Sequence, residues 1–255
     1  MDRTPESLEE IELGYEGVAE FYDLFAGNED LPLYLEYAKK HGSPILDIAA
    51  GTGRVSLALA EAGFVVHALE KSPSMLQVFR RKTAKGEAAE LITIHESDMT
   101  NFNLHTKFPM IIIPASFGHA LTEEKQKSTL RAIKNHLRDD GVFILDLYVG
   151  ELIDDYSTFQ DGPVPLPRGE VRRSGKMTVD REKQLMSLTL KFEVLDFGGS
   201  VAEVHVAKSS TAVICRDDAD NLIQDIGFKV LEEFGDFHRN PYTPESYRRI
   251  LILSH

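Results

Sequence analysis

The segment LDIAAGTGR, residues 46–54, constrains the fold more than any other part of the sequence. It continues an apolar run typical of a buried strand, and it precedes VSLALAEA, residues 55–62, whose apolar positions fit a helix. Between strand and helix, residues 49–53 carry almost no side-chain bulk. Such a turn lets the backbone bend sharply or approach a ligand closely. We therefore expect a strand–turn–helix unit that forms a site for a nucleotide-like ligand.

The same alternation continues along the chain. Strands are predicted at residues 44–48, 64–69, 91–95, 108–113 and 142–147, and helices at 54–62, 73–84 and 122–138. Ser72 and Pro73 support one of these helices, because a hydroxyl cap followed by proline is a common helix start. One or two further helices, within residues 6–25 and 29–41, precede the first strand. Regular alternation of this kind predicts a parallel sheet that is covered on both faces.

The pattern changes after Tyr148. Residues 150–170 are acidic and then proline-rich, and we expect a loop there. From residue 171 apolar and polar residues alternate with a period of two, which predicts a three-stranded antiparallel insertion ending near 214. A helix near 217–227 and two strands complete the chain. The expected fold class is therefore α/β, a Rossmann-like, doubly wound, mostly parallel seven-stranded sheet with an antiparallel β insertion after strand 5.

Composition and charge narrow the cellular setting. The net charge of −13 argues against a nucleic-acid partner, because phosphate binding needs a clustered basic surface. The sequence has no run of roughly 20 apolar residues that would span a bilayer, and its start lacks the features of a signal peptide. The single cysteine, Cys215, excludes an intramolecular disulfide and fits a reducing compartment. We expect a cytoplasmic protein without a membrane partner.

The glycines of the turn are compatible with more than one class of nucleotide-like ligand. Gly51 and Gly53 supply the first two positions of the dinucleotide fingerprint G-x-G-x-x-G, but Ser56 stands where the third glycine permits close helix–strand packing. No GK[ST] follows, which excludes a P-loop. An NAD(P)-dependent oxidoreductase remains an alternative, although Ser56 and the lack of a Tyr-x-x-x-Lys pair count against it.

Together with the residues before it, the turn resembles the first motif of the class I S-adenosylmethionine-dependent methyltransferases. That motif has an acidic residue in the strand, then small residues, then G-x-G, and it is matched by Asp47, Ala49, Ala50, Gly51 and Gly53. The resemblance covers residues 11–147 well and the last two strands more loosely. It implies S-adenosyl-L-methionine as the cofactor. Asp47 would in addition accept hydrogen bonds from N–H groups of the loop.

The resemblance extends to residues after the next strands. Glu70 ends the second strand, where family members place a carboxylate that accepts both ribose hydroxyls. Asp98 and Met99 match the pair that brackets the adenine in family members. We also expect Lys71 and Pro114 to be cofactor-binding residues. For both carboxylates a purely structural role is an alternative to cofactor binding. Glu70 would then only cap the next helix, and Asp98 would only cap a turn.

Two residues, His119 and Tyr15, are assigned to the reacting side of the site. The loop PASFGHALT, residues 114–122, looks like the acceptor loop of small-molecule methyltransferases, including the sugar-amine N-methyltransferases, and assigns His119 as base or orienting group. The stretch GYEGVAEFYDLF, residues 14–25, resembles leading helices that cover the cofactor, with Tyr15 at the reacting centre and Tyr22 against the cofactor. The alternatives are a histidine bonded to backbone in a turn and tyrosines that only bury a helix.

These readings divide the chain into four segments. They are an N-terminal helical lid at 1–43, an S-adenosylmethionine-binding core at 44–149, an antiparallel insertion at 150–214 and the completion of the core sheet at 215–255. The insertion would form the acceptor pocket or a homodimer contact, and it contains no cluster of metal ligands. The resemblance implies an enzyme that moves a methyl group to a nitrogen or oxygen of a small molecule. A non-catalytic protein that only binds S-adenosylmethionine is a further alternative.

Overall fold

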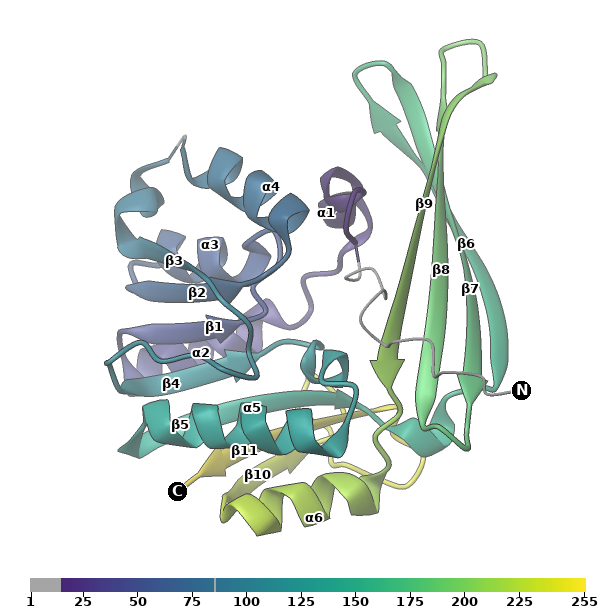
Figure 1. Cartoon of the computed structure of the whole chain (residues 1–255). Helices are drawn as coiled ribbons and strands as arrows, with labels where there is room; N and C mark the ends of the chain where they lie inside the picture. Colours follow the sequence, from purple (N-terminus) through teal and green to yellow (C-terminus); the bar gives the residue numbers. More distant parts are fainter. Residues whose placement is uncertain (1–14, 85) are drawn as a thin grey trace, which may run out of the picture.

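The computed structural model describes residues 15–84 and 86–255, and it is built around a seven-stranded sheet (Figure 1). The strand order is β10-β11-β5-β4-β1-β2-β3. The strands are β1 (Ile45–Ile48), β2 (Val66–Glu70), β3 (Ile92–Glu96), β4 (Phe108–Ile113), β5 (Leu137–Tyr148), β10 (Lys229–Phe234) and β11 (Arg248–Ser254). Strands β1 to β5 pair in parallel, whereas β11 is antiparallel to both of its neighbours. The predicted fold class is confirmed.

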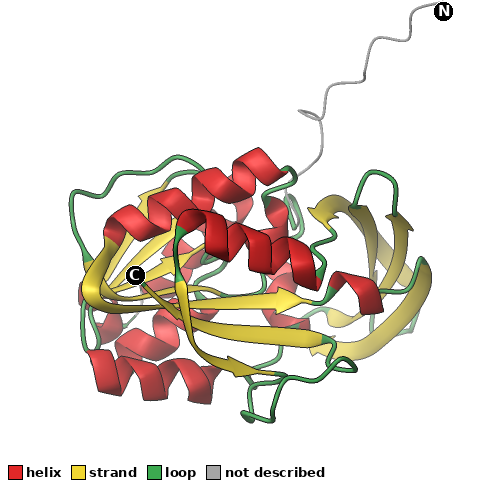
Figure 2. Ribbon diagram, turned by 90° about the horizontal axis from the view of Figure 1, so that it is seen from below, coloured by secondary structure: helices red, strands yellow, loops and turns green. Residues whose placement is uncertain are grey.

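Helices cover both faces of this sheet, as Figure 2 shows from below. They are α1 (Tyr22–Phe25), α2 (Leu31–His41), α3 (Arg54–Glu61), α4 (Pro73–Thr83), α5 (Glu123–His136) and α6 (Arg216–Ile226). Alternate residues of β4 serve the two faces: Ile111 and Ile113 belong to the cluster that includes α5 and α6 residues, and Met110 and Ile112 to the cluster with α2 and α3. A parallel strand that is apolar throughout is therefore buried on both sides.

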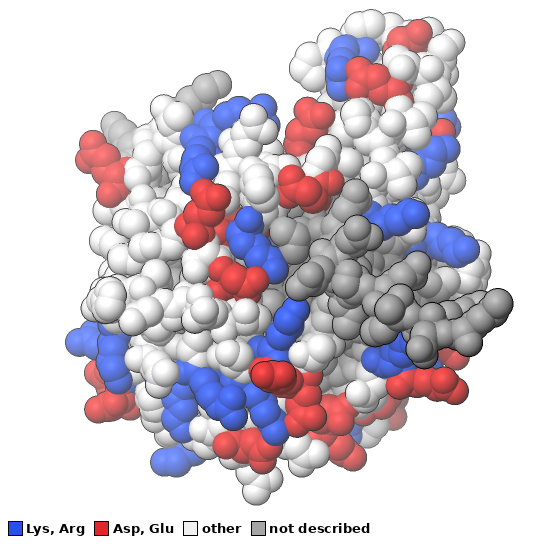
Figure 3. Space-filling view, viewed as in Figure 1, with Lys and Arg blue, Asp and Glu red and all other residues white. Residues whose placement is uncertain are grey.

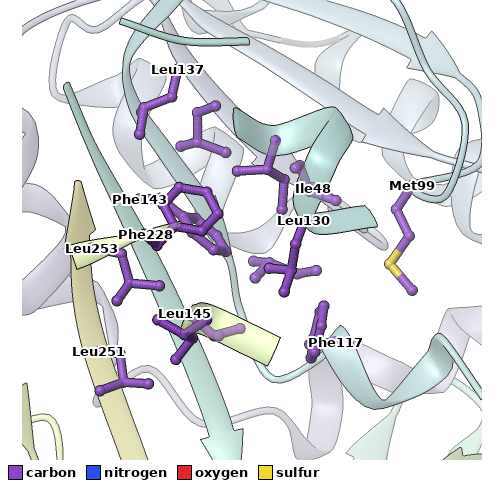
Figure 4. Close-up of a cluster of buried hydrophobic side chains, with 14 of the residues drawn as sticks. Ile48, Met99, Phe117, Leu130, Leu137, Phe143, Leu145, Phe228, Leu251 and Leu253 are labelled. Carbon is purple, nitrogen blue, oxygen red and sulfur yellow. The ribbon is translucent and has the colours of Figure 1, made fainter. Parts of the chain in front are cut away.

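The cluster on the α5 and α6 side contains the large side chains that hold these helices to the sheet (Figure 4). The rings of Phe143 in β5 and Phe228 lie 5.6 Å apart between centroids, and Leu130 reaches the same cluster from α5. Strand β5 begins at Leu137, five residues before the predicted strand at 142–147, since Leu137 already pairs with Phe108 before a register shift. The sequence pattern missed this start because residues 138–140 are exposed and charged.

The insertion forms a second sheet of four strands, so the prediction of three strands was wrong. Its order is β6-β7-β8-β9, with β6 (Tyr156–Leu166), β7 (Gly169–Asp180), β8 (Leu185–Leu195) and β9 (Val201–Ala212). The expected loop at 150–170 contains β6. Its Gly162-Pro163 pair lies at a register shift between Asp161 and Val164, and β6 is an edge strand, where proline is tolerated.

The second sheet stands beside the core, and the N-terminal segment lies between them (Figure 1). Phe21 stacks on Phe192 of β8 with 5.0 Å between ring centroids, while Ala19 packs with Met75 and Val78 of α4. Where helix was expected within residues 6–25, the described part has a 3-10 turn, η2 (Ala19–Phe21), followed by the single turn of α1; residues 6–14 lie outside the described residues. The segment from Tyr15 to Phe25 thus bridges the two sheets.

Candidate functional site

The two glycines of the turn after β1 have different structural roles. Both have positive φ, +59° at Gly51 and +80° at Gly53, which favours glycine at both positions. A Cβ at Gly53 would overlap the ring of Phe79 in α4, so this glycine allows helix α4 to pack closely. At Gly51, among the described residues apart from its chain neighbours, an added Cβ would have one heavy atom within 4 Å, Met75 Sδ at 3.9 Å. The backbone at Gly51 is therefore open to a ligand.

The carboxylate of Glu70 points toward this turn from the end of β2. Its Oε2 accepts a hydrogen bond from Gly51 N at 2.8 Å. Its Oε1 accepts from Lys71 N at 2.8 Å and from Ser72 N at 2.7 Å, close to the start of α4. Both readings of Glu70 are thus compatible with the structure, because it supports the helix start and leaves Oε2 a lone pair beside the open turn.

Asp47, in the middle of β1, is buried and only partly satisfied. Its Oδ2 accepts a hydrogen bond from Ser56 Oγ at 2.6 Å, and its Oδ1 has no partner among the described residues. Burial raises the pKa of Asp47 to about 7. The expected hydrogen bonds from loop N–H groups are not found; the hydroxyl of α3 takes that place. Ser56, which we considered only as a missing glycine, is the residue that holds Asp47.

Asp98 and Lys71 pair beside Glu70. Lys71 Nζ lies 2.7 Å from Asp98 Oδ2, and Asp98 Oδ1 accepts hydrogen bonds from Thr100 N and Thr100 Oγ1. These bonds outweigh burial and lower the pKa of Asp98. Asp98 therefore does cap a turn, and Met99 after it is 7% exposed and packs in the core cluster that contains Ile48. Lys71, Asp98 and Met99 lie at one edge of the candidate site.

The two tyrosines of the N-terminal segment pack against each other. The rings of Tyr15 and Tyr22 meet edge-on with 4.8 Å between centroids, and both rings contact the cluster of Met75 and Val78. Arg173 Nη1 donates to the Tyr15 hydroxyl at 3.4 Å. Burial raises the pKa of both phenols, so they stay protonated near neutral pH. They are suited to orient a ligand by hydrogen bonding and packing, and not to accept a proton.

The N-terminal segment is tied to the glycine turn by contacts whose partners sequence reasoning did not identify. Thr52 Oγ1 donates to Asp23 Oδ1 at 2.7 Å, and Lys82 Nζ of α4 lies 2.8 Å from Asp23 Oδ2. Arg54 forms a bidentate pair with Asp30 just before α2. Thr52 and Arg54 stand in the quoted motif, but their partners are remote in sequence, so no spacing signal identified these contacts.

His119 ends a 3-10 turn, η4 (Phe117–His119), in the loop that follows β4. Its side chain is exposed to solvent, and nearby protein atoms still partly desolvate the ring. This surrounding protein and the nearby charge of Lys71 lower the pKa of His119, while the Ser210 backbone of β9 opposes the shift. The ring is therefore neutral near pH 7. Pro114 begins the same loop, and its carbonyl accepts a hydrogen bond from Ser116 Oγ at 2.8 Å.

A buried ion pair, which sequence reasoning did not predict, holds this loop in place. Asp146 near the end of β5 is 2% exposed and receives Arg248 Nη1 at 2.6 and 2.5 Å on its two oxygens. Its Oδ2 also accepts from Ala115 N at 3.1 Å, where the backbone has a positive φ of 46°. A charged residue inside the apolar strand at 142–147 was the available signal.

A cavity of about 380 Å³ lies where this loop meets the second sheet. Phe117 and Gly118 line it from the loop, Leu147 and Tyr148 from β5, and Met177 and Met186 from β7 and β8. Its volume falls in the range of sites for small molecules. The cavity adjoins the turn that carries His119, so a small molecule bound there would lie beside that turn.

The surface and the metal-ligand pattern give no further site. Lysines, arginines and acidic residues are interspersed on the face seen in Figure 3. Within residues 15–255, apart from residue 85, no group of three or more His, Cys, Asp or Glu is arranged to hold a metal ion. No helix in the same part of the chain has the length and apolar character that crossing a membrane requires.

Comparisons with known proteins identify the family of this chain. Residues 45–141 match a family model described as a methyltransferase domain. The cypemycin N-terminal methyltransferase of Streptomyces sp is 30% identical over 220 residues, which cover 83% of each chain. The glycine/sarcosine N-methyltransferase of Parasynechococcus marenigrum (strain WH8102) is 26% identical, covering 84% of this chain and 73% of the relative. The solved structure of the sugar N-methyltransferase KedS8 from Streptoalloteichus sp ATCC 53650 has a TM-score of 0.75 at 18% identity, covering 100% of this chain and 99% of that chain.

Proposed function

The chain belongs to the class I S-adenosylmethionine-dependent methyltransferases, and from that premise we propose that it transfers the methyl group to an amine nitrogen of a small molecule. The observation that carries the proposal is the position of the Glu70 carboxylate. Its Oε2 accepts a hydrogen bond from Gly51 N at 2.8 Å, beside backbone that is open to a ligand. It is supported by relatives whose names state N-methylation of glycine, of sarcosine or of a sugar. The oxidoreductase reading is not favoured.

The residues present fit S-adenosylmethionine. Asp47 has a buried carboxylate oxygen without a partner among the described residues, and Glu70 retains a free lone pair. A ligand with hydroxyl and ammonium donors matches such acceptors. Glu70 would hold the ribose, Gly51 would allow close approach, and Asp98 with Met99 would border the adenine. When bound, the cofactor supplies a methyl group on a sulfonium, and the amine lone pair forms the N–C bond as the S–C bond breaks to leave a thioether.

His119 is suited to the proton that the amine must lose. An amine is a nucleophile only in its unprotonated form, and an unprotonated imidazole beside it can take up the proton that it loses. Because the pKa of His119 is lowered, its ring is ready to accept a proton at neutral pH. An alcohol is too weak an acid for such a base, so this site favours nitrogen over oxygen. Tyr15, which stays protonated, would orient the acceptor.

The remaining expectations from the sequence belong to this proposal. We infer a cytoplasmic location and no nucleic-acid partner. The mixture of positive and negative side chains on the face in Figure 3 supports the second point, since phosphate binding needs a clustered basic surface. A homodimer contact through the insertion at 150–214 is tested by sedimentation at several protein concentrations.

Two measurements test the proposed function. Calorimetry with S-adenosylmethionine and with NAD should show heat of binding only for the first. Transfer of a labelled methyl group to a panel of amines and matched alcohols should then yield labelled amines. Binding without transfer to any member would favour a non-catalytic binding protein, and labelled alcohols would contradict the assignment to nitrogen.

A further inference from the structure

The side chains that line the cavity between the loop after β4 and the second sheet indicate which kind of ligand it would bind. Among the described residues, none that lines it is Lys, Arg or His. Arg248, which follows the lining residue Tyr247, directs its guanidinium to Asp146 and to the Tyr148 hydroxyl, the latter at 2.6 Å. This cation is therefore already paired. An anionic ligand would find no free cationic partner among the lining residues.

The charged groups that do line the cavity are carboxylates. Asp146, buried in the wall, is already neutralised by Arg248, whereas Asp154 is exposed and forms no ion pair among the described residues. The exposed ring of Tyr247 accompanies them, whereas the guanidinium of Arg248 already lies over the ring of Tyr148, 4.3 Å from its centroid. Carboxylates and aromatic rings attract a cation and repel an anion. These groups favour a ligand that arrives as a protonated amine.

The rest of the lining is apolar. Met177 and Met186 come from neighbouring strands, and the β7–β8 register, which pairs Met177 with Leu188 and Val179 with Met186, places both on the same face of the sheet. Leu152 and Ile153 lie on another side, and Phe117 and Leu147 are almost fully buried beneath. Methionine side chains are flexible, so they can adapt their shape to an irregular apolar ligand. A ligand would gain affinity here through a hydrocarbon or aromatic group.

We propose that this cavity receives the methyl acceptor and that the acceptor is an amine with a bulky apolar group and no carboxylate or phosphate. The inference rests on the proposed function and narrows it. It separates this chain from relatives named for glycine and sarcosine, which carry a carboxylate. A carboxylate in this cavity would lose hydration without a compensating partner, which is costly.

A matched pair of probes tests the acceptor class. Tryptamine and tryptophan differ by one carboxylate, and glycine lacks the apolar group. Binding of each is measured by calorimetry on the protein saturated with S-adenosylhomocysteine, and methyl transfer is measured separately. Tryptamine should bind at least about tenfold more tightly than tryptophan, and glycine should bind more weakly than tryptamine. Equal or tighter binding of tryptophan or glycine, or no binding of tryptamine, would overturn the inference.

A lysine placed in the cavity should reverse the preference. Met186→Lys supplies the missing cation, so the ratio of tryptophan to tryptamine affinity should rise at least about tenfold. Ser187→Lys is the matched control, because Ser187 is exposed and adjacent residues of a strand point to opposite faces. An unchanged ratio in Met186→Lys, with the native circular dichroism spectrum kept, would overturn the assignment of this cavity. Failure to bind S-adenosylmethionine or S-adenosylhomocysteine would instead contradict the proposed function before any probe is added, whereas the probe affinities on the saturated protein test the acceptor class alone.

Discussion

The hydroxyl of Ser56 donates a hydrogen bond to one oxygen of Asp47, and the second oxygen of that buried carboxylate has no partner among the described residues. The pair joins the first turn of α3 to the middle of β1 across the glycine turn. It leaves a buried acceptor in β1, four residues before Gly51. A carboxylate in this setting is costly to ionise until a ligand supplies a positive charge or a donor.

Asp47 should make the stability of the ligand-free protein depend on pH. Its pKa is raised from 3.8 to about 7 in the folded state, so the folded state holds a proton that the unfolded state has lost between those values. The free energy of unfolding should therefore fall as pH rises from about 4 to about 7, by up to about 4 kcal/mol. Urea unfolding at a series of pH values measures this loss.

Asp47→Asn is the comparison, because asparagine keeps an oxygen for Ser56 and does not titrate. The difference in unfolding free energy between wild type and variant isolates the Asp47 contribution from that of other carboxylates. If the two pH profiles run parallel, Asp47 is not protonated in the folded protein.

Glu70→Gln should weaken S-adenosylmethionine binding. Glutamine keeps one acceptor oxygen for the backbone N–H groups, but it removes the charge and replaces the other acceptor by a donor facing the Gly51 N–H. We expect the affinity to fall by about 10- to 100-fold, measured by calorimetry. Glu61→Ala, at the exposed end of α3, is the control and should bind like wild type. Unchanged affinity in Glu70→Gln would show that Glu70 serves only the start of α4.

His119→Ala should reduce turnover far more than cofactor affinity. If His119 accepts the proton of the amine, its loss should lower kcat by about 100-fold or more. In wild type, kcat/KM should rise with pH through the lowered pKa of His119, and this acid limb should vanish in the variant. Added imidazole should restore part of the rate. A variant that keeps the acid limb would place the base elsewhere.

Arg248→Met should destabilise the fold, because it leaves Asp146 buried without its counter-ion. We expect a loss of about 3–5 kcal/mol in the free energy of unfolding, measured with urea. The double variant Asp146→Asn with Arg248→Met should recover much of this loss, since no isolated charge remains. Additive losses in the double variant would mean that the two residues act independently.

Much of this molecule follows from local patterns in the sequence. The continuous apolar run of β4, the capping residues Ser72 and Pro73 and the small residues before α3 each act within a few positions. Such local preferences, repeated as strand and helix in turn, lead to a parallel sheet with a ligand turn at its carboxyl edge. The placement of Glu70 against Gly51 follows from the same rule, because β1 and β2 are neighbours.

Other features depend on contacts between residues far apart in the chain, and only the tertiary structure shows them. The sequence pattern did not predict strand β6 because it contains Pro163 and Pro165, and proline is tolerated there only because β6 lies at the edge of its sheet. The partner of Asp47 and the pairing of Asp146 with Arg248, 102 residues later, depend on how strands and helices stack. The cavity is lined by residues that range along the chain from Ala115 to Tyr247, so its apolar and acidic lining exists only after packing. Local preference acts along the backbone, whereas burial and charge pairing act through space.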